Sequence, residues 1–346
     1  MLLRSFPLLA AFALFVPQLS AADPAPIKVG VIGLDNYQAV AFTELFHNPK
    51  SEGDLKGIKV VAAFAAGSPD IEESAKDILR WSDAMKKLKV EVVASADEVI
   101  KQSDAILVMS VDGRAHLEQL KPIFKAGKPV YVGRPLAASL ADAVEIFRLA
   151  AESKTPIFTC SQHRFSPGFI GMRKHDEVGD VLGADVYGGA TREAHHPDLF
   201  WHAIHGVETL YTIMGPGCVS VSRTTTETAD VVTGVWKDDR VGTFRGISKG
   251  APKYSATVFG SKGVSIAGVY GHGVPVKGVA PTNDKYMGYE ATAVEIAKFF
   301  KSRTPPVTAE ETIELFAFME AADESKRQKG APVKLETVLA LSLIHI

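Results

Sequence analysis

The sequence predicts a two-domain α/β protein, with a parallel sheet at the N-terminus and an α+β domain with a largely antiparallel sheet at the C-terminus. Strand-like and helix-like segments alternate regularly in the first half, and Thr-, Val- and Gly-rich strands follow one another in the second half. The chain has 346 residues, of which 46% are hydrophobic and 23% charged. This composition is typical of a folded globular protein, and the length exceeds what one hydrophobic core usually organises.

Residues 1–22 have the layout of a secretory signal peptide. They contain Arg4, an apolar run over residues 6–16, Pro17, and small residues at 20 and 22 before the expected cut. The apolar run is shorter than the roughly 20 residues that a membrane span needs. We therefore expect export to the periplasm or the cell exterior, with no membrane attachment after cleavage. An uncleaved interfacial anchor is the alternative.

Charge and cysteine content exclude some classes of protein. The chain has 38 basic and 40 acidic residues, a net charge of −2 and no long basic run, so we expect no nucleic-acid binding. Two cysteines, Cys160 and Cys218, do not make a disulfide scaffold in a chain of this length. We expect two buried free thiols.

The first domain is expected over residues 23–160. A strand at 27–33 leads into a tight turn and then a helix. Further strands are expected at 58–64, 90–93, 105–110, 129–132 and 156–159, and helices between them at 71–86, 95–102, 114–126 and 141–153. Because crossovers between parallel strands are right-handed, this series predicts a Rossmann-like sheet with both faces covered.

The second domain is expected over residues 161–339. It begins with a helix near 200–214, and strands follow at 219–225, 230–236, 241–248, 254–259 and 264–268. A final helix is expected at 309–328; Thr308 directly before it and Glu311 in its first turn form a capping box. Residues 340–346 form an apolar tail without cap or periodicity, which resembles translated adapter sequence; we assign it no function.

Several segments, in order along the chain, carry a family resemblance. They are residues 27–33, 114–116 with 126–137, 162–167 and 305–311. In these segments the chain resembles the glucose–fructose oxidoreductase / inositol dehydrogenase (Gfo/Idh/MocA) family. The resemblance implies NAD or NADP as cofactor, hydride transfer on a carbohydrate or polyol, and a homo-oligomer formed through the exposed sheet face.

The turn after the first strand departs from the phosphate-binding pattern Gly-x-Gly-x-x-Gly. It reads Gly33-Leu34-Asp35-Asn36-Tyr37-Gln38, so only the first glycine is kept. Asp35 would repel a pyrophosphate, and Asp35 and Asn36 also suit a helix N-cap. After the second strand, Ala65 and Ala66 offer no carboxylate to a ribose, and Ser68 and Asp70 follow late.

The cofactor contacts that the resemblance implies lie at the edge of the first sheet. They would be made by Gly33, Leu34, Asp35, Asn36, Ser110, Arg134 and Pro135. The alternative is a retained scaffold whose cofactor cleft has closed or has taken another role.

The catalytic residues implied by the resemblance are Arg134, His205 and His202. Arg134 stands where the family has the Lys of Glu-Lys-Pro; it can orient an oxygen but cannot shuttle a proton. His205 with Glu208 matches the family's His-x-x-Asp, and Trp201 replaces the family's Asp. His205 could take a proton, and Trp201 could stack on a sugar ring. The substrate candidates are His163, Arg164, Trp201 and His196, with Tyr270 and His272 as weaker ones.

Four histidines (His195, His196, His202 and His205) lie close together in the sequence and raise the question of a metal. Because His202 and His205 are spaced i and i+3, they could share a helix face and bind Zn²⁺ with His195 or His196. We expect instead a polar substrate cleft without metal. Three functions stay open: an oxidoreductase with weakened NAD(P) binding; a non-redox carbohydrate-binding protein, hydrolase or lyase that uses the histidines; and a purely structural or interaction protein.

Overall fold

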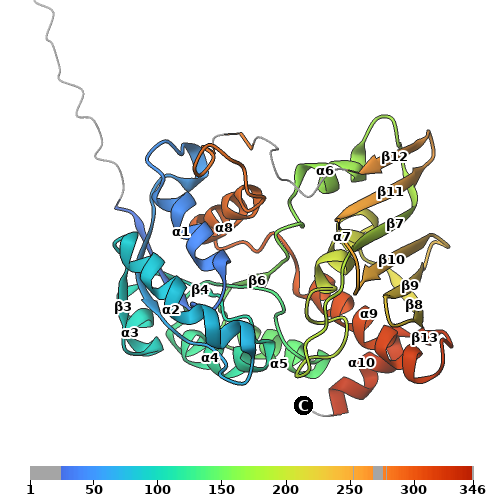
Figure 1. The fold of residues 1–346 in the computed structure, drawn as a ribbon, viewed down its shortest axis with the longest axis horizontal. Helices are drawn as coiled ribbons and strands as arrows, with labels where there is room; N and C mark the ends of the chain where they lie inside the picture. The colour runs from blue at the N-terminus through green and yellow to red at the C-terminus, as the bar shows by residue number, and fades with distance from the viewer. Residues whose placement is uncertain (1–24, 252, 268–275, 278, 345–346) are drawn as a thin grey trace, which may run out of the picture.

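The computed structural model describes residues 25–251, 253–267, 276–277 and 279–344 (Figure 1). The predicted signal peptide, Tyr270 and His272 lie outside the described residues. In the part of the chain that is described, no helix is both long and apolar enough to cross a membrane.

The first sheet has six parallel strands, as the sequence predicts, and the structure places them in the order β3-β2-β1-β4-β5-β6. The strands are β1 (Ile27–Ile32), β2 (Ile58–Phe64), β3 (Glu91–Val93), β4 (Ala105–Val108), β5 (Val130–Val132) and β6 (Ile157–Thr159). The helical segments among them are α1 (Tyr37–His47), the short 3-10 turn η1 (Gly53–Leu55), α2 (Glu72–Lys87), α3 (Ala96–Gln102), α4 (Gly113–Ala126) and α5 (Leu140–Glu152). The strand order reverses between β1 and β4, where a doubly wound sheet forms its ligand crevice.

Short polar side chains begin these helices. Asn36, Ser95, Asp112 and Ser139 each accept a hydrogen bond from a backbone N–H in the first turn of α1, α3, α4 and α5. Thr308 does the same for α9 (Ala309–Arg327) by accepting from the Glu311 N–H, which confirms the predicted cap.

The second sheet is mixed, with seven strands in the order β12-β11-β7-β10-β9-β8-β13. Its strands are β7 (Val181–Gly189), β8 (Cys218–Thr225), β9 (Ala229–Trp236), β10 (Val241–Ile247), β11 (Ser255–Gly260), β12 (Val264–Ala267) and β13 (Val333–Lys334). Strands β7 and β10 run parallel at its centre, and the other neighbouring pairs are antiparallel. The predicted, largely antiparallel second sheet is therefore confirmed.

One face of this sheet is covered by helices. Figure 1 shows α7 (Ile204–Met214) and α9 between the second sheet and the first domain, and both helices pack on its strands. The remaining helical segments are α6 (Pro167–Ile170), the 3-10 turn η2 (Gly171–Lys174), α8 (Glu290–Ser302) and α10 (Leu335–Ile344). Cys160 and Cys218 are both buried and free, as expected from the sequence.

Helix α8 packs on the first domain, although it follows the second sheet in the sequence. It lies beside α1 in Figure 1. Its Ile296 and Phe299 join a core cluster with Val29 of β1 and Phe42 of α1. A segment from beyond residue 161 thus completes the core of the first domain.

Candidate functional site

A cluster of aromatic and cationic side chains lies where the first sheet meets the second domain. Arg134 follows β5, His163 follows β6, His205 is in the first turn of α7, and Tyr254 precedes β11. The ring centroids of His163 and His205 are 5.1 Å apart, and those of His163 and Tyr254 are 4.3 Å apart. We call Arg134, His163, Trp201, His202, His205 and Tyr254 the histidine cluster. It brings together residues that lie up to 120 positions apart in the sequence.

His205 is held in the cluster by a hydroxyl group. Its Nδ1 lies 2.6 Å from Oγ of Ser161, which also accepts a hydrogen bond from the His163 N–H. Burial of His205, together with the positive charge of Arg134, lowers its pKa far below the ordinary histidine value. The ring is therefore neutral at neutral pH and its orientation is fixed through Nδ1.

His202 lies before α7 rather than in it. The helix begins at Ile204, with Ala203 as the cap residue, so the predicted shared helix face of His202 and His205 is wrong. The turn that ends at the helix start carries His202 together with Trp201, whose ring centroid is 5.9 Å from Cζ of Arg134. Burial and the charge of Arg134 lower the pKa of His202 to about 4.

Glu208 supplies a buried carboxyl group behind His205. Its Oε2 accepts a hydrogen bond of 2.9 Å from the Ser161 N–H. Burial raises the pKa of Glu208 to about 7, against the lowering effect of Arg164 and of this hydrogen bond. Arg164 itself pairs with Glu311, so this predicted substrate residue is engaged within the protein. A small cavity of about 10 Å³ adjoins these side chains. Its lining includes Arg134, Arg164, Glu208 and Glu311.

Glu208 gives a prediction for pH-dependent stability. Because its folded-state pKa of about 7 lies above the ordinary value of 4.5, the folded chain loses stability as pH rises from about 4.5 to about 7. The loss is about 3 kcal/mol at about 1.4 kcal/mol per pKa unit. We expect Glu208→Gln to reduce the difference in unfolding free energy between pH 5 and pH 8 by this amount in urea titrations. Glu227→Gln, at an exposed site, is the control; equal pH dependence in Glu208→Gln and the wild type would refute the assignment.

His195 and His196 lie outside the cluster. His196 is buried between Asp112 and Glu193, with Nε2 3.3 Å from Asp112 Oδ1 and Nδ1 2.9 Å from Glu193 Oε2. His195 is exposed and its Nδ1 lies 2.7 Å from Glu193. Within the described residues, no group of three His, Cys, Asp or Glu side chains is arranged to hold a metal ion, so the set His195, His202 and His205 forms no metal site.

The first turn keeps a glycine because the loop after β4 approaches it closely. Gly33 has φ of +99°, and a Cβ at this position would lie 2.2 Å from the Ser110 nitrogen. The Gly33 and Leu34 N–H groups donate to the carbonyls of Phe64 (3.0 Å) and Ala66 (3.3 Å) at the end of β2. Leu34 and Ser110 are buried, as is Pro135, which follows a cis peptide bond.

Asn36 and Asp35 have different roles in this turn. Asn36 caps α1, with Oδ1 accepting from the Gln38 N–H at 2.8 Å. Asp35 is fully buried; its two oxygens accept from Ser74 Oγ (2.8 Å) and from the Val111 N–H (3.1 Å). Burial raises the pKa of Asp35 to about 6, opposed by these hydrogen bonds.

The turn does not fit a bound dinucleotide in this arrangement. A pyrophosphate is held by backbone N–H groups that point at it from the turn and the helix start. Here the N–H groups of Gly33, Leu34 and Gln38 already donate within the protein. Four of the predicted cofactor contacts, Gly33, Leu34, Asp35 and Asn36, therefore make hydrogen bonds within the chain itself.

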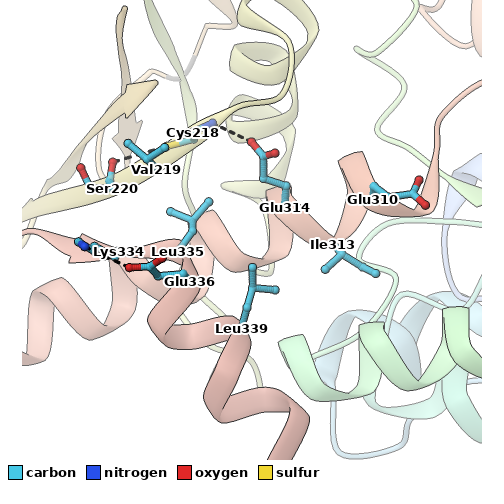
Figure 2. Close-up of a pocket in the computed structure, with 10 residues that line it drawn as sticks. All are labelled: Cys218, Val219, Ser220, Glu310, Ile313, Glu314, Lys334, Leu335, Glu336 and Leu339. Atoms are coloured by element: carbon cyan, nitrogen blue, oxygen red, sulfur yellow. Dashed lines mark hydrogen bonds and ion pairs between the residues drawn. The ribbon is translucent and has the colours of Figure 1, made fainter. Parts of the chain in front are cut away.

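A larger groove lies elsewhere. It has a volume of about 680 Å³ and separates the start of β8 from α9 and α10; apolar side chains such as Val219, Ile313 and Leu339 line it (Figure 2). Its carboxylate Glu314 accepts hydrogen bonds from the N–H groups of Gly217 (2.7 Å) and Cys218 (2.9 Å). None of the histidine cluster lines this groove, so the two features are separate.

Sequence reasoning missed three residues that organise the site. Ser161 orients His205, Tyr254 contacts His163, and Asp112 contacts His196. Ser161 directly precedes the segment 162–167 that carries the family resemblance, so its position was the available signal. Tyr254 and Asp112 stand in no motif, and only the fold brings them to their partners.

Comparison with known proteins agrees with the fold. Residues 27–160 match the family described as "Oxidoreductase family, NAD-binding Rossmann fold" (GFO_IDH_MocA). The "Uncharacterized oxidoreductase YhhX" of Escherichia coli (strain K12) is 30% identical over 93 residues, which is 27% of this chain and 27% of that protein. The chain thus aligns with about a quarter of this relative's length.

Solved structures are similar over almost the whole chain. A "probable dehydrogenase from Thermotoga maritima" has a TM-score of 0.70 at 21% identity, over 90% of this chain and 100% of that one. Scyllo-inositol dehydrogenase from Lactobacillus casei, solved with bound cofactor NAD(H) and scyllo-inositol, has a TM-score of 0.70 at 15% identity, over 90% and 99%. At these identities the likeness establishes the fold. Together with the family match it supports an oxidoreductase with a nicotinamide cofactor. Residues 27–160 of this chain thus match the Gfo/Idh/MocA oxidoreductase family, and the likeness to solved structures extends the shared fold to the second domain.

Proposed function

We propose that this protein binds a carbohydrate or polyol at the histidine cluster and moves a proton of one of its hydroxyl groups. The observation that supports this most directly is the convergence of Arg134, His205 and Trp201 at the carboxyl ends of β5 and β6. In open α/β sheets this edge is where ligands bind. The inositol dehydrogenases of similar fold are consistent with a polyol as substrate class.

The cluster offers a distinct role to each of these three side chains. Trp201 is 3% exposed, and its ring, 5.9 Å from Cζ of Arg134, would hold that guanidinium in place. Arg134 stays charged at every relevant pH and would stabilise negative charge on a substrate oxygen. In the tautomer whose Nδ1–H donates to Ser161, the neutral His205 would have Nε2 left to accept a hydroxyl proton.

Two functions are compatible with carbohydrate binding at this cluster. The first is the family reaction, in which the substrate carbon gives a hydride to NAD or NADP. The second is a non-redox function, as a carbohydrate-binding protein or as a hydrolase or lyase. The second is favoured by one observation: the backbone donors that would hold a pyrophosphate are occupied within the chain. We derive no hydride step, because the first turn does not fit the dinucleotide as arranged.

Calorimetric titration with a panel of carbohydrates and polyols that includes myo-inositol, scyllo-inositol and glucose tests the shared part of the proposal. We expect saturable binding by at least one compound without any nucleotide, and a loss of about 10-fold to 100-fold in affinity for Arg134→Ala, because a hydrogen bond to a charged group contributes about 1.5–3 kcal/mol. Appearance of absorbance at the nicotinamide band with NAD or NADP would select the first reaction. No binding by any compound on the panel would overturn the proposal.

We also propose that the protein is exported and that residues 1–22 are removed. Their composition supports this, with one Arg, an apolar run and small residues before the expected cut. Cell fractionation followed by intact-mass measurement tests it. A mass that retains residues 1–22 in the exported fraction would favour the anchor alternative.

The outer face of the second sheet leads to a prediction about assembly. Val241, Phe259, Val264 and Ile266 are 46%, 39%, 65% and 75% exposed on strands β10, β11 and β12. Exposed apolar patches of this kind commonly mark protein interfaces. We expect a homo-oligomer in light scattering after gel filtration, and a shift toward monomer in Ile266→Asp. A monomeric wild-type protein would contradict this expectation.

A further inference from the structure

The loops that should border a cofactor crevice are tied to one another through Asp112. This carboxylate, in the loop between β4 and α4, accepts hydrogen bonds from Ser68 in the loop after β2 and from Arg114 Nε at 3.0 Å. Arg114 Nη2 continues the chain of contacts to Asp70, at 2.9 Å. His196 of the second domain lies 3.3 Å from the same carboxylate. Asp112 therefore connects two loops of the first domain and one segment of the second.

These contacts stabilise the negatively charged form of the Asp112 carboxyl group. Burial alone would raise the pKa of its carboxyl group, but the nearby His196 ring and hydrogen bonds from Arg114 and Ser68 hold the pKa well below its usual range. Asp112 also caps α4 by accepting from the Arg114 N–H at 2.9 Å. An anion that is buried and fully partnered in this way fixes the loop that carries it.

Asp35 fastens the first turn to the same loops. It stands where the phosphate-binding pattern has its second glycine, and it accepts from Ser74 at the start of α2 and from the Val111 N–H after β4. A dinucleotide needs bare backbone at this position so that its pyrophosphate can approach. Here the side chain turns inward and draws the loops after β1, β2 and β4 together.

Apolar contacts between the two domains lie beside the contacts of Asp112. Trp201 is 3% exposed and forms a separate apolar cluster with Ile71 and Val111. The His196 ring packs against Trp201, with centroids 4.8 Å apart. Ile71 and Val111 belong to the two loops that Asp112 connects, so polar and apolar contacts hold the same three segments.

We propose that this crevice is a permanent joint between the two domains, in which Asp35, Asp112, His196 and Trp201 take the place of a dinucleotide, and that the chain binds no free NAD or NADP there. A cofactor at this edge would have to break the contacts of Asp112, expose Trp201 and displace the Asp35 carboxylate. Phosphate contacts to the first turn could not compensate for these losses, because the N–H groups of Gly33, Leu34 and Gln38 would also have to lose their present acceptors.

The first test is titration of the purified full chain with NAD⁺, NADH, NADP⁺ and NADPH by calorimetry. We expect no saturable heat up to about 1 mM, the range in which binding free energies fall to about 4 kcal/mol. In hydrogen exchange, the Val111 amide, which donates to Asp35, should be protected without nucleotide and unchanged with it. Saturable binding of any of the four nucleotides at this crevice, shown by a change in the exchange of Val111, would overturn the proposal.

The second test breaks the joint with a matched control. Asp112→Ala removes the contacts to Ser68, Arg114 and His196 together with a helix cap, whereas Ser139→Ala removes the cap of α5, its hydrogen bond to the Asp142 N–H, without touching the joint. We expect Asp112→Ala to lower the midpoint of thermal unfolding by roughly 5 °C or more and Ser139→Ala by about 2 °C. Equal changes in the unfolding midpoint of the two variants would overturn the proposal that Asp112 joins the domains. If Asp112→Ala does not fold, the nucleotide titration and the exchange of Val111 in the wild type still decide.

This inference deepens the second candidate reaction but does not need a sugar ligand. Absence of nucleotide binding together with absence of carbohydrate binding would leave the joint standing and remove the proposed function. Binding of both a nucleotide and a carbohydrate would remove the joint and leave the proposed function standing.

Discussion

Replacing Arg223 with Ala is expected to lower the free energy of unfolding by about 3–5 kcal/mol, because it leaves the buried Asp323 carboxyl group without its ion-pair partner and removes one of the two cations that pair with the buried Asp230. The Arg223 side chain is fully buried, and its Nε and Nη2 donate to Asp230 Oδ1 at 3.0 and 2.8 Å. Nη2 also donates to Asp198 at 2.8 Å, and Nη1 donates to Asp323. The network ties the segment that precedes the histidine cluster to the second sheet and to α9.

Urea denaturation measures this loss directly. Arg327→Ala is the matched control, since Arg327 is 58% exposed and also pairs with carboxylates on its own helix; we expect it to change the unfolding free energy by less than about 1 kcal/mol. If the two variants lose similar amounts, the buried network around Arg223 does not stabilise the fold as described.

Replacing His205 with Gln is expected to lower kcat by about 100-fold to 10,000-fold for whichever compound of the carbohydrate panel is converted, with affinity changed by only a few fold. Gln keeps a polar group near Ser161 but cannot take up a proton. The effect should fall on kcat rather than on KM, because the proposed role of His205 is proton transfer and not positioning alone.

Steady-state kinetics and calorimetry on the same preparation separate these effects. His175→Gln, outside the histidine cluster, is the control and should retain wild-type kcat. A His205→Gln protein with unchanged kcat would show that His205 only supports the pocket, and a protein that loses binding in equal measure would show that it acts on the ground state.

Most of the first domain was predictable because its elements are local. Each parallel strand is a short apolar run, and each helix has its own apolar face and, at Ser95, Asp112 and Ser139, its own capping side chain. The predicted strand at residues 58–64 has the bounds of β2.

The elements that sequence reasoning missed depend on contacts across the fold. Strand β7 is rich in glycine, which local propensity disfavours in strands. Its glycines are needed because neighbours approach closely: a Cβ on Gly183 would lie 2.7 Å from the Val241 carbonyl oxygen, and one on Gly188 would lie 2.5 Å from the Tyr254 ring. Helix α8 was missed as well, and it lies against the first domain although it follows the second sheet.

Some residues of the candidate site were likewise predictable from the sequence, and others were not. The resemblance indicated Arg134, His163, Trp201, His202 and His205, and the structure places these residues in one cluster. It also indicated His196, which lies in the joint with Asp112 instead. The expected start of the second-domain helix near residue 200 was several residues early, and the inferred common face of His202 and His205 was wrong for that reason.

The amino-acid order by itself determined the alternating strands and helices, the helix caps and the absence of two of the three phosphate-turn glycines. Only the tertiary structure decided what replaces them. Asp35 finds its partners 39 and 76 residues away, in loops that meet because the strand order places β1 between β2 and β4. Hydrogen bonds between such loops depend on their separation in space, and local sequence pattern carries no information about that separation.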